Sequence, residues 1–277
     1  METTAVPRIV VGVIDAPESE LAIRWAAQHA ERVGGRVHLV HAMVWGELGV
    51  NIDPVPGIAD SGMGAVAEAL LEDAAAIVRE TAPGIEVTAE SVSGNATAVL
   101  VGASRGAAAI VVGGRGLGRL LTLLVGSKSL ALAARAHCPV VIVRGDIEIA
   151  GPIGVVDSED RSVLDRAADL AAAYGVGVDL IVGHATVPAH ADRFLAHARR
   201  EAHEHQPNVE VSTVHIPDAR GARELIRVAE GTSLIVVPAP HAPDAHGTVP
   251  VTPSLSSVLR FANTPVWIER PVTGAES

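Results

Sequence analysis

A run of small and hydroxyl residues between positions 113 and 129 has the composition of an anion-binding loop. Glycine stands at 113, 114, 116 and 118, and after an apolar stretch the chain reaches Gly126-Ser127 and a second hydroxyl at Ser129. Glycine lets the backbone approach phosphate oxygens closely, and a helix N-terminus offers unpaired N–H groups and the positive end of the helix dipole. Ser127 is a good N-cap for the helix that the following residues predict. The segment is therefore a candidate phosphate loop.

The spacing of these residues distinguishes between kinds of phosphate loop. A Walker A loop needs G-x-x-x-x-G-K-[ST], and Ser127 stands where its lysine should be. A Rossmann fingerprint needs G-x-G-x-x-G, whereas residues 114–118 give G-x-G-x-G. The residues do fit G-x-x-G, nine residues, then G-[ST], counted from Gly113. This pattern closely resembles the nucleotide-binding motif of the universal stress protein family, and AHCPVVIVR (136–144) resembles the last helix and strand of that family.

The resemblance implies that the loop holds the triphosphate of ATP and that the adenine contacts the backbone near the end of the second strand. A divalent cation such as Mg²⁺ could bridge the phosphates. The basic residues of the loop could balance the polyphosphate, or they could be solvated side chains of an exposed loop. The nucleotide site expected on this basis comprises Asp15, Met43, Val112, Gly113, Arg115, Gly116, Arg119, Gly126, Ser127, Lys128 and Ser129.

The residues after the first strand depart from the family pattern. The family usually has Val-Asp-Gly-Ser there, with the aspartate contacting the nucleoside. In this chain Ile14 stands at the aligned position and Asp15 follows it. Because a one-residue slip turns a strand side chain to the opposite face, two interpretations remain open. Either the loop is wound so that Asp15 points inward, or Asp15 is an ordinary carboxylate favoured by the dipole at a helix start.

The elements that must position the loop alternate between strand and helix. This alternation predicts a flavodoxin-like, HUP-type α/β domain with a five-stranded parallel sheet of order 3-2-1-4-5 and helices on both faces. The loops that leave the first and fourth strands then face one pocket. We expect strands over 8–13, 37–44, 85–92, 108–112 and 140–143, helices over 21–32, 65–79, 96–103 and from 127, and a long loop over 45–64. The first of these helices is expected to start at Glu18 or Ser19.

A second copy of this pattern follows a short linker. Residues 153–158 repeat residues 11–16, and the ending NTPVWIER mirrors HCPVVIVR. The repetition predicts two tandem domains, residues 1–146 and 147–277, that pack as a pseudo-dimer. Where the first copy has GGRGLG, the second reads PAPHAP over 238–243. Since proline donates no N–H and a Cβ blocks close approach, we expect weak nucleotide binding there or none.

Composition limits the partners. The formal net charge of −11 argues against a nucleic-acid or anionic-membrane partner, and 2% aromatic residues argue against RNA-stacking surfaces. The single cysteine, Cys138, excludes an internal disulfide and fits a reducing cytosol. With no H-x-x-x-H pair and no uninterrupted run of eighteen apolar residues, we expect a cytoplasmic protein without a metal site. The apolar stretch over 120–125 is expected to make a subunit contact, as in a homodimer.

The sequence therefore predicts a regulatory or sensor protein of the stress response that binds ATP, or another adenine nucleotide, in its N-terminal domain. Turnover is expected to be little or none because no catalytic constellation is visible. One alternative is an interaction protein that binds no nucleotide and retains the glycine loop only structurally. A less favoured alternative is a slow ATPase.

Overall fold

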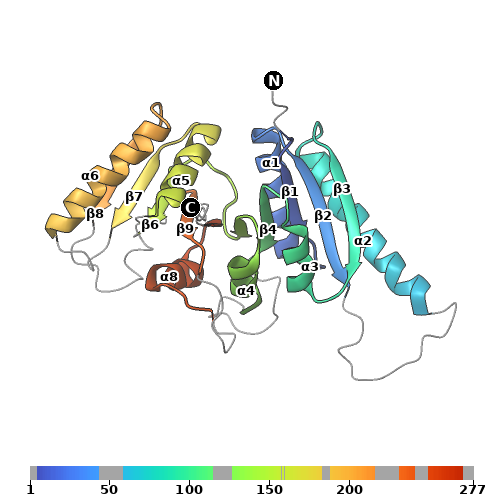
Figure 1. Ribbon diagram of the computed structural model, residues 1–277. Coiled ribbons are helices and arrows are strands. Elements are labelled where there is room, and N and C mark those ends of the chain that lie inside the picture. The colour runs from blue at the N-terminus through green and yellow to red at the C-terminus, as the bar shows by residue number, and fades with distance from the viewer. Residues whose placement is uncertain are drawn as a thin grey trace. The chain divides into compact units, whose positions relative to one another are not determined.

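The computed structural model describes residues 5–43, 59–114, 127–156, 158, 160–182, 188–215, 231–240 and 249–270. The chain divides into two compact units. Unit 1 contains residues 1–119 and 136–138, and unit 2 contains residues 120–135 and 139–277. Each unit is a layer of strands with helices packed against it (Figure 1).

Unit 1 holds four parallel strands in the order β3-β2-β1-β4. The first four positions of the predicted 3-2-1-4-5 order are thus confirmed. Helices α1 and α2 pack against each other and against the strands, and the short α3 packs on β2. The elements of unit 1 are β1 (Arg8–Gly12), α1 (Pro17–Arg32), β2 (Arg36–Met43), α2 (Ala59–Thr81), β3 (Val87–Ser93), α3 (Ala96–Ala103) and β4 (Ala109–Gly113).

Unit 2 contains a complete copy of the predicted order. Strands β8-β7-β6-β9-β10 are parallel neighbours, which corresponds to 3-2-1-4-5 within the second repeat. The described elements are α4 (Ser127–Arg135), β5 (Val140–Val143), β6 (Ile153–Val156), α5 (Arg161–Tyr174), β7 (Val178–Val182), α6 (Pro188–His205), β8 (Val211–His215), β9 (Leu234–Pro238), α8 (Pro253–Phe261) and β10 (Val266–Glu269).

The fifth strand of the first repeat also pairs with a strand of the second repeat. β5 pairs antiparallel with β10, with Val141 opposite Trp267, and it belongs to unit 2. Arg144, directly after β5, donates to the carbonyl of Leu259 in α8 at 2.7 Å. The compact units therefore do not follow the sequence repeat, because the last helix and strand of the first copy fold with the second. The division of the sequence into domains 1–146 and 147–277 stays a prediction, based on the sequence repeat.

Local sequence explains several helix boundaries. α3 begins after Asn95, whose side chain accepts from the N–H groups of Thr97 and Ala98, and α5 begins after Asp160, which accepts from Ser162 N. α5 ends at Gly175 in the left-handed conformation, with φ of 69°. The Asn95 cap places α3 over the predicted residues.

Two boundaries differ from the predicted ones. α1 begins at Pro17 instead of Glu18 or Ser19. The fixed φ of proline suits the first position of a helix, and its missing N–H is no loss there because an N–H at that position has no partner within the helix. α2 begins at Ala59, so the last part of the predicted 45–64 loop is helical. Gly62 and Gly64 had suggested a loop, but the rest of the helix provides tertiary packing that overrides their low helix propensity.

The core of both layers consists of aliphatic side chains. Ile9, Val10 and Val11 of β1 are fully buried, as are Ile110 and Val111 of β4. Continuous β-branched runs of this kind are typical of parallel strands covered on both faces. Two tryptophans, Trp25 in α1 and Trp267 in β10, are the largest fully buried side chains.

Candidate functional site

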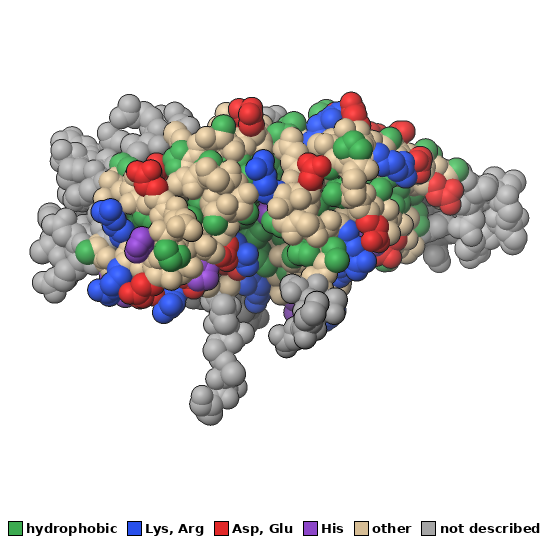
Figure 2. All heavy atoms as spheres, turned by 90° about the horizontal axis from the view of Figure 1, so that it is seen from above, with side chains coloured by type: hydrophobic (Ala, Val, Ile, Leu, Met, Phe, Trp, Pro, Cys, Tyr) green, Lys and Arg blue, Asp and Glu red, His purple; other side chains and the backbone are tan. Residues whose placement is uncertain are grey.

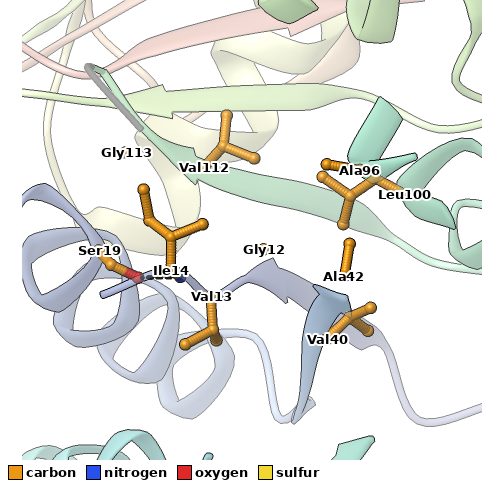
Figure 3. Close-up of a pocket in the computed structure, with 10 residues that line it drawn as sticks. All are labelled: Gly12, Val13, Ile14, Ser19, Val40, Ala42, Ala96, Leu100, Val112 and Gly113. Carbon is orange, nitrogen blue, oxygen red and sulfur yellow. Dashed lines mark hydrogen bonds between the residues drawn. The ribbon is translucent and has the colours of Figure 1, made fainter. Parts of the chain in front are cut away.

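A pocket lies at the carboxyl ends of β1, β2 and β4 in unit 1, where open α/β sheets bind their ligands. Its cavity volume is about 40 Å³, and it opens to solvent at the strand ends. The walls come from the three strand ends, the loop after β1, the first turn of α1 and one face of α3 (Figure 3). The lining residues are Gly12, Val13, Ile14, Ser19, Val40, Ala42, Ala96, Leu100, Val112 and Gly113.

Two adjacent residues of β4 show which helix covers which face of the sheet. A Cβ placed on Gly12 would lie 3.1 Å from Leu100 Cδ1 and 3.3 Å from Val112 Cγ1, so Val112 faces α3. A Cβ on Gly113 would lie 2.4 Å from the carbonyl oxygen of Glu18, in the first turn of α1. Since successive strand side chains point to opposite faces, α3 and α1 cover opposite faces of β4. The pocket opens at the strand ends between these two helices.

The peptide group that joins Val13 to Ile14 is hydrogen-bonded at both ends by side chains. His41 Nδ1 lies 2.9 Å from the Val13 carbonyl oxygen, and the Ile14 N–H donates to Ser19 Oγ at 3.1 Å. Val13 N–H also donates to the Val40 carbonyl at 2.9 Å. In this conformation Ile14 projects toward Val112 and Gly113, while Val13 points to the other side of the strand (Figure 3).

The structure distributes the predicted site residues as follows. Val112 and Gly113 line the pocket. Asp15 is exposed, one residue before the N-cap Ala16, and is not among the lining residues, while Ile14 is. Met43 ends β2 half-buried, and its carbonyl accepts from Gly94 N–H at 2.9 Å, also outside the pocket lining.

The remaining predicted site residues belong to the loop and to α4. Arg115, Gly116, Arg119 and Gly126 lie outside the described residues. Ser127 is the first residue of α4, followed by Lys128, and Ser129 is buried at 5% exposure within unit 2. The helix start predicted at residue 127 is confirmed.

Sequence reasoning did not assign Ser19, Ala96 or Leu100 to the site, whereas Ala42 belongs to the end of the second strand, where the adenine was expected. Ser19 had been considered only as a helix start, and its role as acceptor for Ile14 N–H depends on the loop conformation. Ala96 and Leu100 are four residues apart, on one face of α3, which is a detectable helical spacing. That this face meets the end of β1 is a tertiary relationship with no local sequence signal.

On the face seen in Figure 2, acidic and basic side chains are interspersed. Within the described residues no group of three or more His, Cys, Asp or Glu could hold a metal ion. No helix in the described part of the chain is long and apolar enough to cross a membrane.

Strand register aligns the two repeats differently from the sequence match. Ile9 pairs with Ala109, the first residue of β4, as Ile153 pairs with Leu234, the first residue of β9. Ile153 thus corresponds to Ile9, two places from the match of 153 with 11 that the sequence suggested. Short runs such as V-G-V are too degenerate to fix the alignment.

With this register, Val156 of the second repeat corresponds to Gly12 of the first. Val156 is 1% exposed, so its side chain is packed where the first repeat has a glycine that lines a pocket. The start of α5 at Arg161 corresponds in the same way to the start of α1 at Pro17. The two repeats therefore differ at the strand end as well as in the loop.

Comparison with known proteins identifies the family. The model of the universal stress protein family matches residues 6–144. Universal stress protein Rv2623 of Mycobacterium tuberculosis is 30% identical over 95% of this chain and 96% of its own length, and Rv2005c of the same organism is 30% identical over 95% and 96%. A universal stress protein structure from Archaeoglobus fulgidus has the same fold, with a TM-score of 0.73 at 15% identity, over 95% of this chain and 98% of that one. The chain therefore belongs to the universal stress protein family, as a tandem of two α/β repeats.

Proposed function

We propose that the N-terminal repeat binds an adenine nucleotide, ATP by the family resemblance, with the nucleoside in the pocket of unit 1. The observation that carries this proposal is the pocket itself, which lies at the strand ends and is lined by Gly113, the first glycine of the predicted loop. The phosphates are assigned from the sequence to Gly113, Gly116, Gly126, Ser127 and Ser129, with Arg115, Arg119 and Lys128 as balancing charges.

The chemistry of the described pocket lining suits the uncharged part of a nucleotide. Among the described residues no ionisable side chain lines the pocket, and its walls are aliphatic apart from Ser19 and the two glycines. Burying a charge among such groups is costly, whereas a base buries apolar area there. Any Mg²⁺ would be held mainly by the phosphates, because the pocket lining contains no carboxylate. Bound ATP would act as the signal, and the residues of this chain would bind and orient it.

We infer a regulatory or sensor role in the cytoplasm with little or no hydrolysis. A general base must lie within hydrogen-bond reach of the water that it activates, and none of the lining residues is a carboxylate, histidine or lysine. The buried thiol of Cys138 fits a reducing compartment.

The alternative, an interaction protein without nucleotide, is favoured by one observation. Ile14 occupies the pocket wall where the family pattern has an aspartate, and Asp15 is exposed. This exchange removes a polar contact to the nucleoside, so the alternative is a direct competitor of the first proposal.

Denaturing protein purified from cells and analysing the released small molecules by chromatography separates the two. Near-stoichiometric adenine nucleotide supports the proposal. Equilibrium dialysis against ATP then compares Gly12→Val with Gly102→Ala. The valine adds a side chain between Leu100 and Val112, whereas a Cβ on Gly102 meets nothing within 4 Å. We expect Gly12→Val alone to weaken binding by at least about tenfold. Absence of nucleotide in both assays would favour the interaction protein.

A further inference from the structure

The described walls of the unit 1 pocket offer a ligand very few hydrogen-bonding side chains. Ser19 is the single polar side chain among the lining residues, and at 3% exposure its Oγ already accepts from the Ile14 N–H. The carbonyls of Val13 and Ile14 are also engaged, by His41 Nδ1 and by Ala16 N–H, both at 2.9 Å. The pocket therefore recognises what enters it mainly by shape and apolar contact.

Ile14 is held in this wall by the hydrogen bonds on its own peptide group. His41 fixes the carbonyl end and Ser19 fixes the N–H end, from β2 and α1 respectively. With both ends fixed, rotating the loop to bring Asp15 into the pocket would break two hydrogen bonds that involve half-buried or buried groups. Each such loss is unfavourable because it leaves a buried polar group without its partner. Asp15 therefore does not replace the missing polar contact.

We infer that Ile14 makes this site permissive toward the nucleoside. This inference rests on the proposed nucleotide function. A pocket built to hydrogen-bond a ligand rejects analogues that lack the bonded group by about 10⁴-fold or more, because its own buried groups are then left unpaired. An apolar pocket discriminates by only about 10–200-fold, and mainly by volume. Purine nucleotides that differ in ring substituents or in the 2′-hydroxyl should therefore bind alike.

The test measures dissociation constants of the full chain for ATP, GTP and 2′-deoxy-ATP by isothermal titration calorimetry. For the native protein we expect the three values to agree within about tenfold. Ile14→Asn adds a neutral donor and acceptor to the wall, and the spread among the three nucleotides should widen beyond about tenfold. Ile14→Val keeps the wall apolar and serves as the matched control, with the native spread retained.

Each outcome bears on a different statement. Agreement of the three constants in the native protein and in Ile14→Val, together with a wider spread in Ile14→Asn, supports the inference. A preference of the native protein for ATP by more than about 100-fold overturns the inference but leaves the proposed nucleotide function standing. An unchanged spread in correctly folded Ile14→Asn shows that residue 14 does not set selectivity. No binding of any of the three to the native protein overturns the proposed function and the inference together.

Discussion

His41 Nδ1 lies 2.9 Å from the carbonyl oxygen of Val13, and because a carbonyl only accepts hydrogen bonds, this nitrogen carries the proton. The neutral ring therefore has its lone pair on Nε2. The bond joins the end of β2 to the turn after β1, and so connects two of the three strand ends that border the pocket.

Replacing His41 by alanine should loosen the turn that carries Ile14. The expected cost is about 1–2 kcal/mol in the free energy of unfolding, measured with urea, because one hydrogen bond and its packing are lost. Nucleotide binding should weaken as well. His38→Ala is the control, since His38 contacts Thr88 and Glu90 on β3 and not the pocket. Equal effects of the two substitutions on binding would contradict the role given to His41.

Gly113 should be needed for stability independently of any ligand. An alanine Cβ would lie 2.4 Å from the Glu18 carbonyl oxygen and 2.7 Å from its carbon, so β4 or the first turn of α1 must move. We expect Gly113→Ala to lower the free energy of unfolding by about 1–3 kcal/mol. Gly84→Ala, where a Cβ meets nothing within 4 Å, should be near neutral. Native stability of Gly113→Ala would show that the contact relaxes without cost.

A buried carboxylate near the end of β10 should contribute strongly to unit 2. Glu269 Oε2 accepts from Trp267 Nε1 and from Arg166 Nε, each at 2.7 Å, and the Arg166 guanidinium carbon lies 5.4 Å from the centre of the Trp267 ring. Removing the carboxylate takes away both bonds in a site where Glu269 is 6% exposed. Glu269→Ala should cost about 2–4 kcal/mol, below the full value for a buried pair because Arg166 is partly exposed.

Thermal and urea unfolding of Glu269→Ala can be compared with Glu72→Ala. Glu72 makes an exposed ion pair with Arg79 at 2.9 Å, and such pairs contribute less than about 1 kcal/mol. Glu269→Gln should fall between the two, because an amide oxygen can still accept one hydrogen bond. If Glu269→Ala and Glu72→Ala cost the same, the cluster around Trp267 does not stabilise the fold.

Asp179 should make stability depend on pH in the acid range. Its partial burial in β7, assisted by the negative charge of Glu210, raises the pKa of this carboxyl above its usual 3.8. Between the usual and the raised pKa the folded protein binds more protons than the unfolded chain. The contribution of Asp179 to the free energy of unfolding therefore falls as pH rises through that interval, and it is unfavourable above it.

Asp179→Asn should consequently be more stable than the native protein at pH 7, with the advantage shrinking toward pH 4. Urea unfolding at several pH values measures the difference. Glu210→Gln removes the smaller of the two causes and should give a smaller gain of the same sign. An advantage that grows as pH falls would show that the pKa of Asp179 is lowered in the folded state.

The sequence was sufficient for most of the elements because their signals are local. α3 and β5 occur over the predicted residues, since a side-chain cap marks the start of the helix and Pro139 precedes the strand. Prediction was weaker where local propensity competed with packing. The glycines near the start of α2 suggested a loop, and the helix nevertheless begins at Ala59.

Only those site residues that belong to one continuous strand and its loop could be predicted from the sequence. Val112 and Gly113 were assigned from the strand that leads into the glycine loop, and both line the pocket. The choice between Ile14 and Asp15 could not be made from sequence, because it depends on hydrogen bonds from His41 and Ser19, residues that lie on separate elements. The same limitation applies to Leu100, which reaches the pocket only because α3 packs on β2.

The antiparallel pairing of β5 with β10 has a consequence for how the protein is made. β10 leaves the ribosome about 120 residues after β5, so during synthesis β5 has one open edge of unpaired amides and carbonyls. That edge is a template for another nascent chain until its proper partner arrives. Newly made chains should thus depend on chaperones during this interval, and expression yield should fall when translation slows between the codons for the two strands.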